Sequence, residues 1–141
     1  MPSTFVSVTR LRVRKVRYLP GFAYYTIRSY FQARKAKGNL LTAIARDEGL
    51  VFWTKTAWES ELAMRNFRNS GEHRTIMPKL ATWCDEATYV HWLQDSRYLP
   101  SWPEACTRLI EEGTVSKVHF PSSNHPGRTF SSRWVERRPQ K

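Results

Sequence analysis

The chain has 141 residues, of which 40% are hydrophobic and 13% aromatic, a length and composition that favour one globular fold and exclude a disordered chain. Its formal net charge is +11, and residues 1–46 contain ten basic residues but no acidic ones. No apolar run reaches the roughly eighteen residues that a membrane-spanning helix needs, and the first residues lack a signal-peptide pattern, so we expect a cytoplasmic protein.

The uneven charge has two interpretations. Clustered basic residues can bind nucleic acid, or associate weakly with an anionic surface. A solvated basic face on a soluble protein is the simpler explanation of the same composition.

A strand and an amphipathic helix are predicted first along the chain. Residues 5–13 alternate and are rich in β-branched side chains, which is typical of a strand. Pro20 suits the start of a helix that ends at Gly38. At about 100° per residue, one broad arc of this helix contains Phe22, Ala23, Tyr24, Ile27, Tyr30, Phe31 and Ala33, and the opposite side contains Arg28, Gln32 and Lys35.

The following segments predict a hairpin, a helical region and a last strand. They are strand 40–46, turn 47–49, strand 50–58, helix 60–69, a second helical segment to about Trp83, and strand 86–93. The order strand, helix, strand, strand, helix, strand predicts a ferredoxin-like α+β fold, which is a four-stranded antiparallel sheet with helices on one face.

The strand at residues 50–58 has large apolar side chains on both faces. Val51 and Trp53 lie on one face, and Phe52 and Trp58 lie on the other. Because the predicted helices cover only one face, the other face must be buried in some other way. Two such sheets packed face to face would bury it, so the sequence predicts a homodimer.

The chain is predicted to divide into a barrel domain, residues 1–98, and a C-terminal helical flap with a basic tail, residues 99–141. Residues 115–130 have the composition of a loop or loose hairpin, and residues 136–141 that of a frayed tail.

The C-terminal segment begins with a helix. Ser101 and Glu104 have the spacing of a capping box, and the helix that they start runs from Trp102 to Glu112 before Gly113 ends it. Its apolar stripe predicts that it docks on the core, as a flap beside the pocket.

The junction after the strand at residues 50–58 is similar to a known superfamily. The strand ends in Ala-Trp-Glu-Ser (residues 57–60), Phe67 follows in the helix, and Ser-Gly-Glu-His-Arg occupies residues 70–74. These features resemble the antibiotic-biosynthesis-monooxygenase superfamily of dimeric α/β barrels, over roughly residues 4–95. Thr-Arg-Leu at residues 9–11 and the basic, aromatic first helix resemble its spheroidene-monooxygenase-like branch more closely.

This resemblance implies a ligand pocket between the sheet and the two helices. Its walls would be formed by Thr9, Phe22, Tyr24, Ile27, Phe31, Trp53 or its neighbour Phe52, Phe67, His73 and Met77. Such a pocket suits a conjugated apolar molecule, such as a polyene, a quinol or a haem-like compound. It implies a monooxygenase or a non-catalytic protein that binds a small hydrophobic ligand, although a fold alone does not define a function. The same side chains would also make an ordinary packed core.

Haem is one cofactor that the resemblance suggests. Haem-degrading members use an asparagine, a tryptophan and an axial histidine, and Thr9, Phe67 and Met77 stand at those places here, so that type of haem degradation is not expected. Spheroidene-monooxygenase-like proteins are associated with haem, and His73 is then the candidate axial ligand. A helix-end histidine that binds nothing is the plainer interpretation.

Cofactor-independent oxygenation is the other route that the resemblance implies. An electron-rich substrate loses a proton and reacts with oxygen in a dry aromatic pocket, which needs a base or hydrogen-bond partner that faces the ligand. Tyr24, Arg28, His73 and His91 are the candidates, and the sequence does not choose among them.

Other classes of site lack their motifs. The histidines and the two cysteines, Cys84 and Cys106, have no zinc-binding spacing, and the hydrolase, P-loop and dinucleotide signatures are absent from the sequence. A basic single-stranded RNA-binding module has the same strand and helix order. Residues 50–58 lack its basic-Gly-aromatic signature, so nucleic-acid binding is the less favoured alternative.

Overall fold

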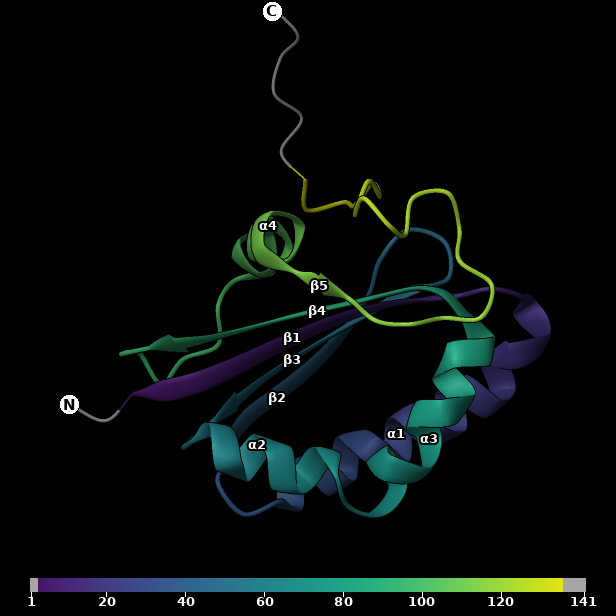
Figure 1. Cartoon of the computed structure of the whole chain (residues 1–141). Coiled ribbons are helices and arrows are strands. Elements are labelled where there is room, and N and C mark those ends of the chain that lie inside the picture. Colours follow the sequence, from purple (N-terminus) through teal and green to yellow (C-terminus); the bar gives the residue numbers. More distant parts are fainter. Residues whose placement is uncertain (1–2, 136–141) are drawn as a thin grey trace, which may run out of the picture.

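The computed structural model describes residues 3–135, without the side chains of Glu72 and His73, and contains one sheet with helices on both faces (Figure 1). The strands are β1 (Thr4–Val13), β2 (Asn39–Arg46), β3 (Val51–Trp58), β4 (Cys84–Gln94) and β5 (Thr114–Val115). The helices are the short η1 (Val16–Tyr18), followed by α1 (Leu19–Lys35), α2 (Glu61–Arg68), α3 (Gly71–Trp83) and α4 (Trp102–Glu112). No helix of the described residues is both long and apolar enough to cross a bilayer.

The strands lie in the order β2-β3-β1-β4-β5, and each neighbouring pair is antiparallel. The helices α1, α2 and α3 cover one face of this sheet (Figure 1). The predicted ferredoxin-like α+β fold is therefore confirmed. The two-residue strand β5, which was not predicted, extends the sheet beside β4.

Local sequence signals account for the helix boundaries. The Ser60 hydroxyl accepts a hydrogen bond from the Ala63 backbone N–H at the start of α2, and the Ser101 hydroxyl accepts one from the Glu104 N–H at the start of α4. Both bonds satisfy backbone donors that a helix start leaves unpaired. Gly38 after α1 has φ +86°, a conformation that glycine adopts without steric cost.

The second face of the sheet is covered by α4 and the C-terminal segment, residues 124–135. Trp53 is fully buried there, and its ring meets Phe130 and Trp134 at centroid distances of 6.2 and 5.8 Å. The Arg128 guanidinium donates to the Ile110 carbonyl at 3.0 Å and so ties the segment to α4. This core cluster combines Val6, Val8, Val51, Trp53 and Val90 of the sheet with Ala105, Cys106 and Leu109 of α4.

This arrangement corrects one expectation and removes the reason for another. The helix α4 does dock on the sheet, but on the face opposite the pocket, so it is not a flap beside the pocket mouth. The homodimer was inferred from an uncovered apolar face, but α4 and residues 124–135 cover that face within the chain, so the dimer itself stays a prediction. The predicted basic tail, residues 136–141, lies outside the described residues.

A buried carboxylate holds the C-terminal segment in place. Asp47 accepts hydrogen bonds from the Trp53 indole N–H at 3.0 Å, the Arg133 backbone N–H at 3.0 Å and the Ser132 hydroxyl. Burial acts to raise the pKa of Asp47, but the hydrogen bonds, led by that of Ser132, outweigh it and lower the pKa below 3.8. The ionised carboxylate therefore stabilises the packing of β3 against residues 132–134.

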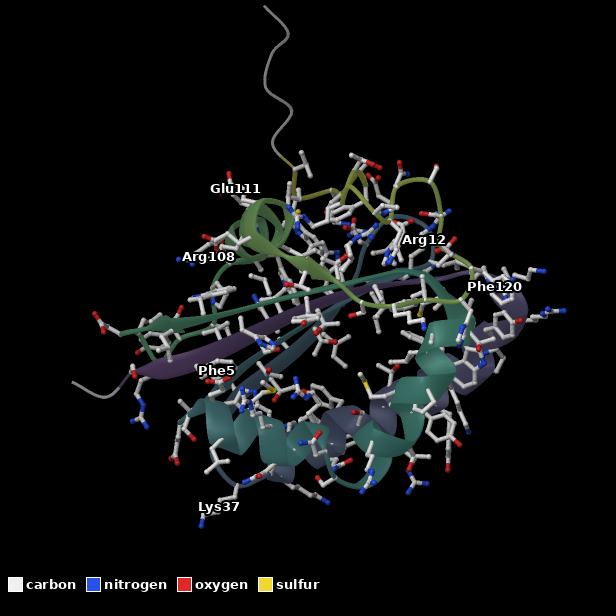
Figure 2. All side chains as sticks on the ribbon, viewed as in Figure 1. Phe5, Arg12, Lys37, Arg108, Glu111 and Phe120 are labelled. Atoms are coloured by element: carbon white, nitrogen blue, oxygen red, sulfur yellow. The ribbon has the colours of Figure 1, made fainter. Side chains whose placement is uncertain are left out.

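A buried ion pair lies on the same face of the sheet, under the C-terminal segment. Arg10 is 2% exposed and donates to Glu86 at 2.9 Å, with the Phe130 ring 3.7 Å from its guanidinium carbon. Arg12, which lies on the α4 side of the sheet (Figure 2), donates to the same carboxylate at 2.9 Å. Because a lone buried charge is costly, the pairing with Glu86 allows Arg10 to stay buried beneath Phe130 of the C-terminal segment.

We expect Asp47→Ala to lower the free energy of unfolding by about 3 kcal/mol, because it leaves buried donors of Trp53 and Ser132 unsatisfied. Urea unfolding followed by tryptophan fluorescence measures this loss, and exposed Glu48→Ala is the control. Since the folded pKa lies below 3.8, the contribution is present above that pH and is lost as the pH falls below it. Equal stability of the two variants would contradict this role of Asp47.

Candidate functional site

A cavity of about 410 Å³ lies between the sheet and the helices α1, α2 and α3. The strands β1 to β4 form its floor, the helices form its roof, and residues 116–118 after β5 contribute to its rim. This volume falls in the range of small-molecule sites.

The floor is unusually rich in hydroxyl groups. Strand alternation places Ser7 and Thr9 of β1 toward the cavity, whereas Val6 and Val8 point into the core under α4. The strand register aligns these side chains in two cross-strand rows, the first made of Thr42, Thr56, Ser7 and His91 and the second of Ile44, Thr54, Thr9 and Tyr89.

The roof is apolar. Side chains of the three helices face the hydroxyl rows, and they are Phe22, Ala33, Met64, Phe67, Ile76, Met77 and Leu80. A flat apolar molecule would therefore contact hydrocarbon and aromatic groups on one side and hydrogen-bonding groups on the other.

His91 lies at the β4 end of the first row. It pairs with Ser7 across the strands, and its ring lies 5.1 Å from that of Tyr89 and 5.2 Å from that of Phe5, measured between centroids. These neighbours fix the imidazole on the cavity side of the sheet.

The pKa of His91 is lowered from its ordinary value of 6.5. Burial is the largest cause of the lower pKa, and the positive charge of Arg68 is the next. The charge of Arg65 lowers the pKa further, whereas the negative charge of Glu61 raises it. The imidazole is therefore neutral at pH 7, the form that accepts a proton.

The described lining of the cavity is basic. Among the residues that the structure describes there, it contains Arg68 and Lys117 but no aspartate or glutamate. Cations near a cavity favour an anionic ligand, and a site with restricted access to water strengthens this effect.

Five of the residues predicted to bind ligand line the cavity: Thr9, Phe22, Phe52, Phe67 and Met77. Of the two alternatives Trp53 and Phe52, Trp53 is excluded, because strand alternation turns it to the opposite face, under Phe130 and Trp134. Its neighbour Phe52 takes the cavity side and contacts Phe22 at a centroid distance of 5.0 Å.

Four other predicted residues lie on the outer face of α1 and not in the cavity. Tyr24, Ile27 and Phe31 are each more than half exposed, and Arg28 donates to the Tyr24 hydroxyl at 2.6 Å on the same outer surface. The arc drawn from the sequence was too wide, because α1 has large apolar side chains around most of its circumference. Its inward face is instead formed by Phe22, Thr26, Ser29 and Ala33.

His73 stands in the first turn of α3, and its side chain lies outside the described residues. Its predicted roles as catalytic group and haem ligand therefore stay predictions. Among the side chains that the structure describes, no group of three or more His, Cys, Asp and Glu residues is placed to hold a metal ion.

Sequence reasoning missed most of the polar floor. Ser7, Thr54, Thr56 and Tyr89 were not proposed, and His91 was only one of four candidate bases. The sequence did contain a signal for the floor, which is the alternation of small hydroxyl residues on β1 and β3. Such a pattern indicates a strand face that is neither part of an apolar core nor exposed to solvent.

The covered sheet face bears on the RNA-binding alternative. An RNA-recognition motif stacks bases on aromatic side chains of its open sheet. Here the described residues of α4 and the C-terminal segment occupy that face, and Trp53 is 0% exposed. This face is therefore closed to base stacking in the conformation that the structure describes.

Several solved structures share this fold. A conserved protein from Methanosarcina mazei matches with a TM-score of 0.57 and 15% identity, over 64% of this chain and 92% of its own. A variant of SnoaB, a cofactor-independent oxygenase from Streptomyces nogalater, matches with a TM-score of 0.51 and 15% identity, over 67% of this chain and 94% of its own. An antibiotic biosynthesis monooxygenase matches with a TM-score of 0.56 and 11% identity, over 65% of this chain and 97% of its own.

At these identities the likeness shows the fold alone, which is that of antibiotic-biosynthesis-monooxygenase-like proteins. No protein-family model matches the sequence, and no curated protein is similar to it in sequence. The expected fold is thus shown, whereas membership of the superfamily and of its spheroidene-monooxygenase-like branch stays a prediction.

We expect Ser29→Phe, which fills the cavity from the inward face of α1, to weaken binding of an apolar fluorescent dye by about tenfold or more, a loss of about 1.4 kcal/mol. The control is Ala23→Phe, on the exposed face of the same helix. Fluorescence titration measures both dissociation constants. If the two variants bind the dye equally well, the dye does not occupy this cavity.

Proposed function

We propose that the protein is a cofactor-independent monooxygenase that acts on a flat, conjugated small molecule with an ionisable position, such as a quinol. The observation that carries this proposal is the neutral His91 at the end of a hydroxyl-lined floor, inside a cavity whose described lining residues include no carboxylate. The fold shared with SnoaB, itself a cofactor-independent oxygenase, supports the reaction class.

Binding follows from the two walls of the cavity. The aromatic rings of Phe22, Phe52 and Phe67 offer area for an aromatic ligand, and offset stacking adds roughly 0.5 to 1.5 kcal/mol per pair. The hydroxyls of Ser7, Thr9 and Thr54 on the opposite wall can donate to ligand oxygens. The two walls together would fix the plane and the edge that the ligand presents to β4.

Proton removal is the first chemical step. His91 accepts a proton from the ionisable position of the substrate, and the positive charges of Arg68 and Lys117 stabilise the resulting anion. The apolar roof limits competing contact with water.

Oxygen then reacts with the substrate anion. A carbon–oxygen bond forms and gives a hydroperoxide, whose outer oxygen receives the proton from His91. Loss of water, which breaks the O–O bond and removes the proton left on the reacting carbon, converts that carbon, a CH₂ group in anthrone or in the keto form of a quinol, into C=O. The substrate supplies all four electrons, so one oxygen atom enters the product, the other leaves as water, and His91 returns to its neutral form.

The cofactor, the substrate class and the cellular location each have a further proposal. Haem bound through His73 is a separate possibility, tested by the visible spectrum of the protein after addition of haemin, and a polyene substrate would follow from the spheroidene-monooxygenase-like branch. A cytoplasmic location also stays a proposal.

Assembly is a further proposal. A homodimer built through the sheets would require residues 124–135 to leave the second face, because they cover it in this conformation. Light scattering at micromolar concentration decides between this dimer and a chain of 16.6 kDa.

We expect His91→Gln to reduce oxygen uptake with anthrone or naphthoquinol by about a hundredfold or more, the usual contribution of a general base. The exposed His119→Gln is the matched control. In the wild type, kcat/KM should fall as the pH drops below 6.5 and protonates His91, and this dependence should vanish in His91→Gln. Wild-type uptake by His91→Gln, with the dye still bound, would contradict the role of His91 as base.

A further inference from the structure

The outer face of α1 is apolar at its centre and basic at its edges. At 100° per residue, the exposed side chains Tyr24, Ile27, Phe31, Arg28, Arg34 and Lys35 fall within an arc of about 120°. Ile27, Phe31 and Tyr24 occupy the middle of this arc, Arg34 lies at one edge, and Lys35 and Arg28 lie at the other. We call these six residues the α1 outer face.

The apolar centre of this face is exposed. Tyr24, Ile27 and Phe31 are 53%, 56% and 51% exposed. Isolated apolar residues on a surface need no explanation, but three large ones on consecutive turns of one helix mark an interaction surface. They are not needed for the fold, because α1 is anchored to the sheet by Phe22 and Ala33 on its inward face.

Charge selects the partner. The charged residues of the α1 outer face are Arg28, Arg34 and Lys35, and the face contains no acidic residue. Lys37, which follows α1 in the chain, also points away from the sheet (Figure 2). A partner complementary to this surface must combine negative charge with an apolar layer beneath it.

We infer that the α1 outer face binds the surface of an anionic lipid bilayer. The helix would lie in the membrane plane, with Tyr24, Ile27 and Phe31 among the head groups and the upper acyl chains, and with Arg34 and Lys35 on lipid phosphates. The Tyr24 hydroxyl and the Arg28 guanidinium are 2.6 Å apart. Both would lie at the level of the lipid head groups, with the Tyr24 ring and the Arg28 methylene groups against the apolar layer. This inference does not depend on the proposed function, because the cavity lies on the other side of α1.

Co-sedimentation with vesicles tests the inference. We expect the wild type to sediment with vesicles of phosphatidylcholine and about one third phosphatidylglycerol, and not with phosphatidylcholine alone. Raising the salt from about 0.1 M to about 1 M should release much of the protein, because the Debye length falls from about 10 to about 3 Å.

Matched variants separate this face from the rest of the surface. Arg34→Gln and Lys35→Gln should each weaken partitioning about fivefold, the change that corresponds to about 1 kcal/mol per basic residue. Ile27→Ser and Phe31→Ser should weaken it as well. Arg97→Gln and Leu93→Ser, at exposed positions away from α1, should have no effect, and circular dichroism checks that every variant is folded.

Each other outcome overturns the inference. Equal loss in the α1 variants and in the Arg97 and Leu93 variants would mean a nonspecific charge effect. Binding of a single-stranded RNA that depends on Arg34 and Lys35, without vesicle binding, would make the partner a nucleic acid. Self-association that Phe31→Ser abolishes, again without vesicle binding, would make the partner a second copy of the chain.

Discussion

Trp53 is buried by the chain's own C-terminal segment, and the roles of both sheet faces follow from this packing. Its ring lies between the sheet and the aromatic pair Phe130 and Trp134, and its indole N–H donates to Asp47, which also holds Ser132 and Arg133. One buried carboxylate thereby links β3, the turn before it and the last described residues. The core cluster with the most buried residues is formed on this side, from residues of this chain.

Because the face under α4 provides this core, the other face does not have to be uniformly apolar. Ser7, Thr9, Thr54 and Thr56 occupy positions where a single-core protein would place valine or isoleucine. The helices face these hydroxyls across an unfilled volume of about 410 Å³. A protein interior is normally close-packed, so a polar floor under an apolar roof is better explained by a ligand than by folding.

The fold could be predicted from the sequence because it depends on periodic patterns. The alternation of β1 and β3, the caps at Ser60 and Ser101, and the glycine after α1 each appear as a local signal. It was harder to predict which face of its strand or helix each apolar residue occupies. Both faces of β3 and most of the circumference of α1 are apolar, so Trp53 and Phe31 fit either side of their elements until the packing of residues 124–135 and of α1 is known. His91 was found only as one candidate because its pKa depends on burial and on Arg68 of another element.

The neutral imidazole in the cavity can be observed directly by NMR titration of the histidine rings, with His91 assigned by comparison with His91→Gln. We expect the His91 ring to titrate below pH 6.5 in the free protein, and we expect its resonances to shift when naphthoquinol is added in the absence of oxygen. A His91 pKa at or above 6.5, or unchanged His91 resonances while the quinol binds, would contradict the placement of His91 as the base of this site.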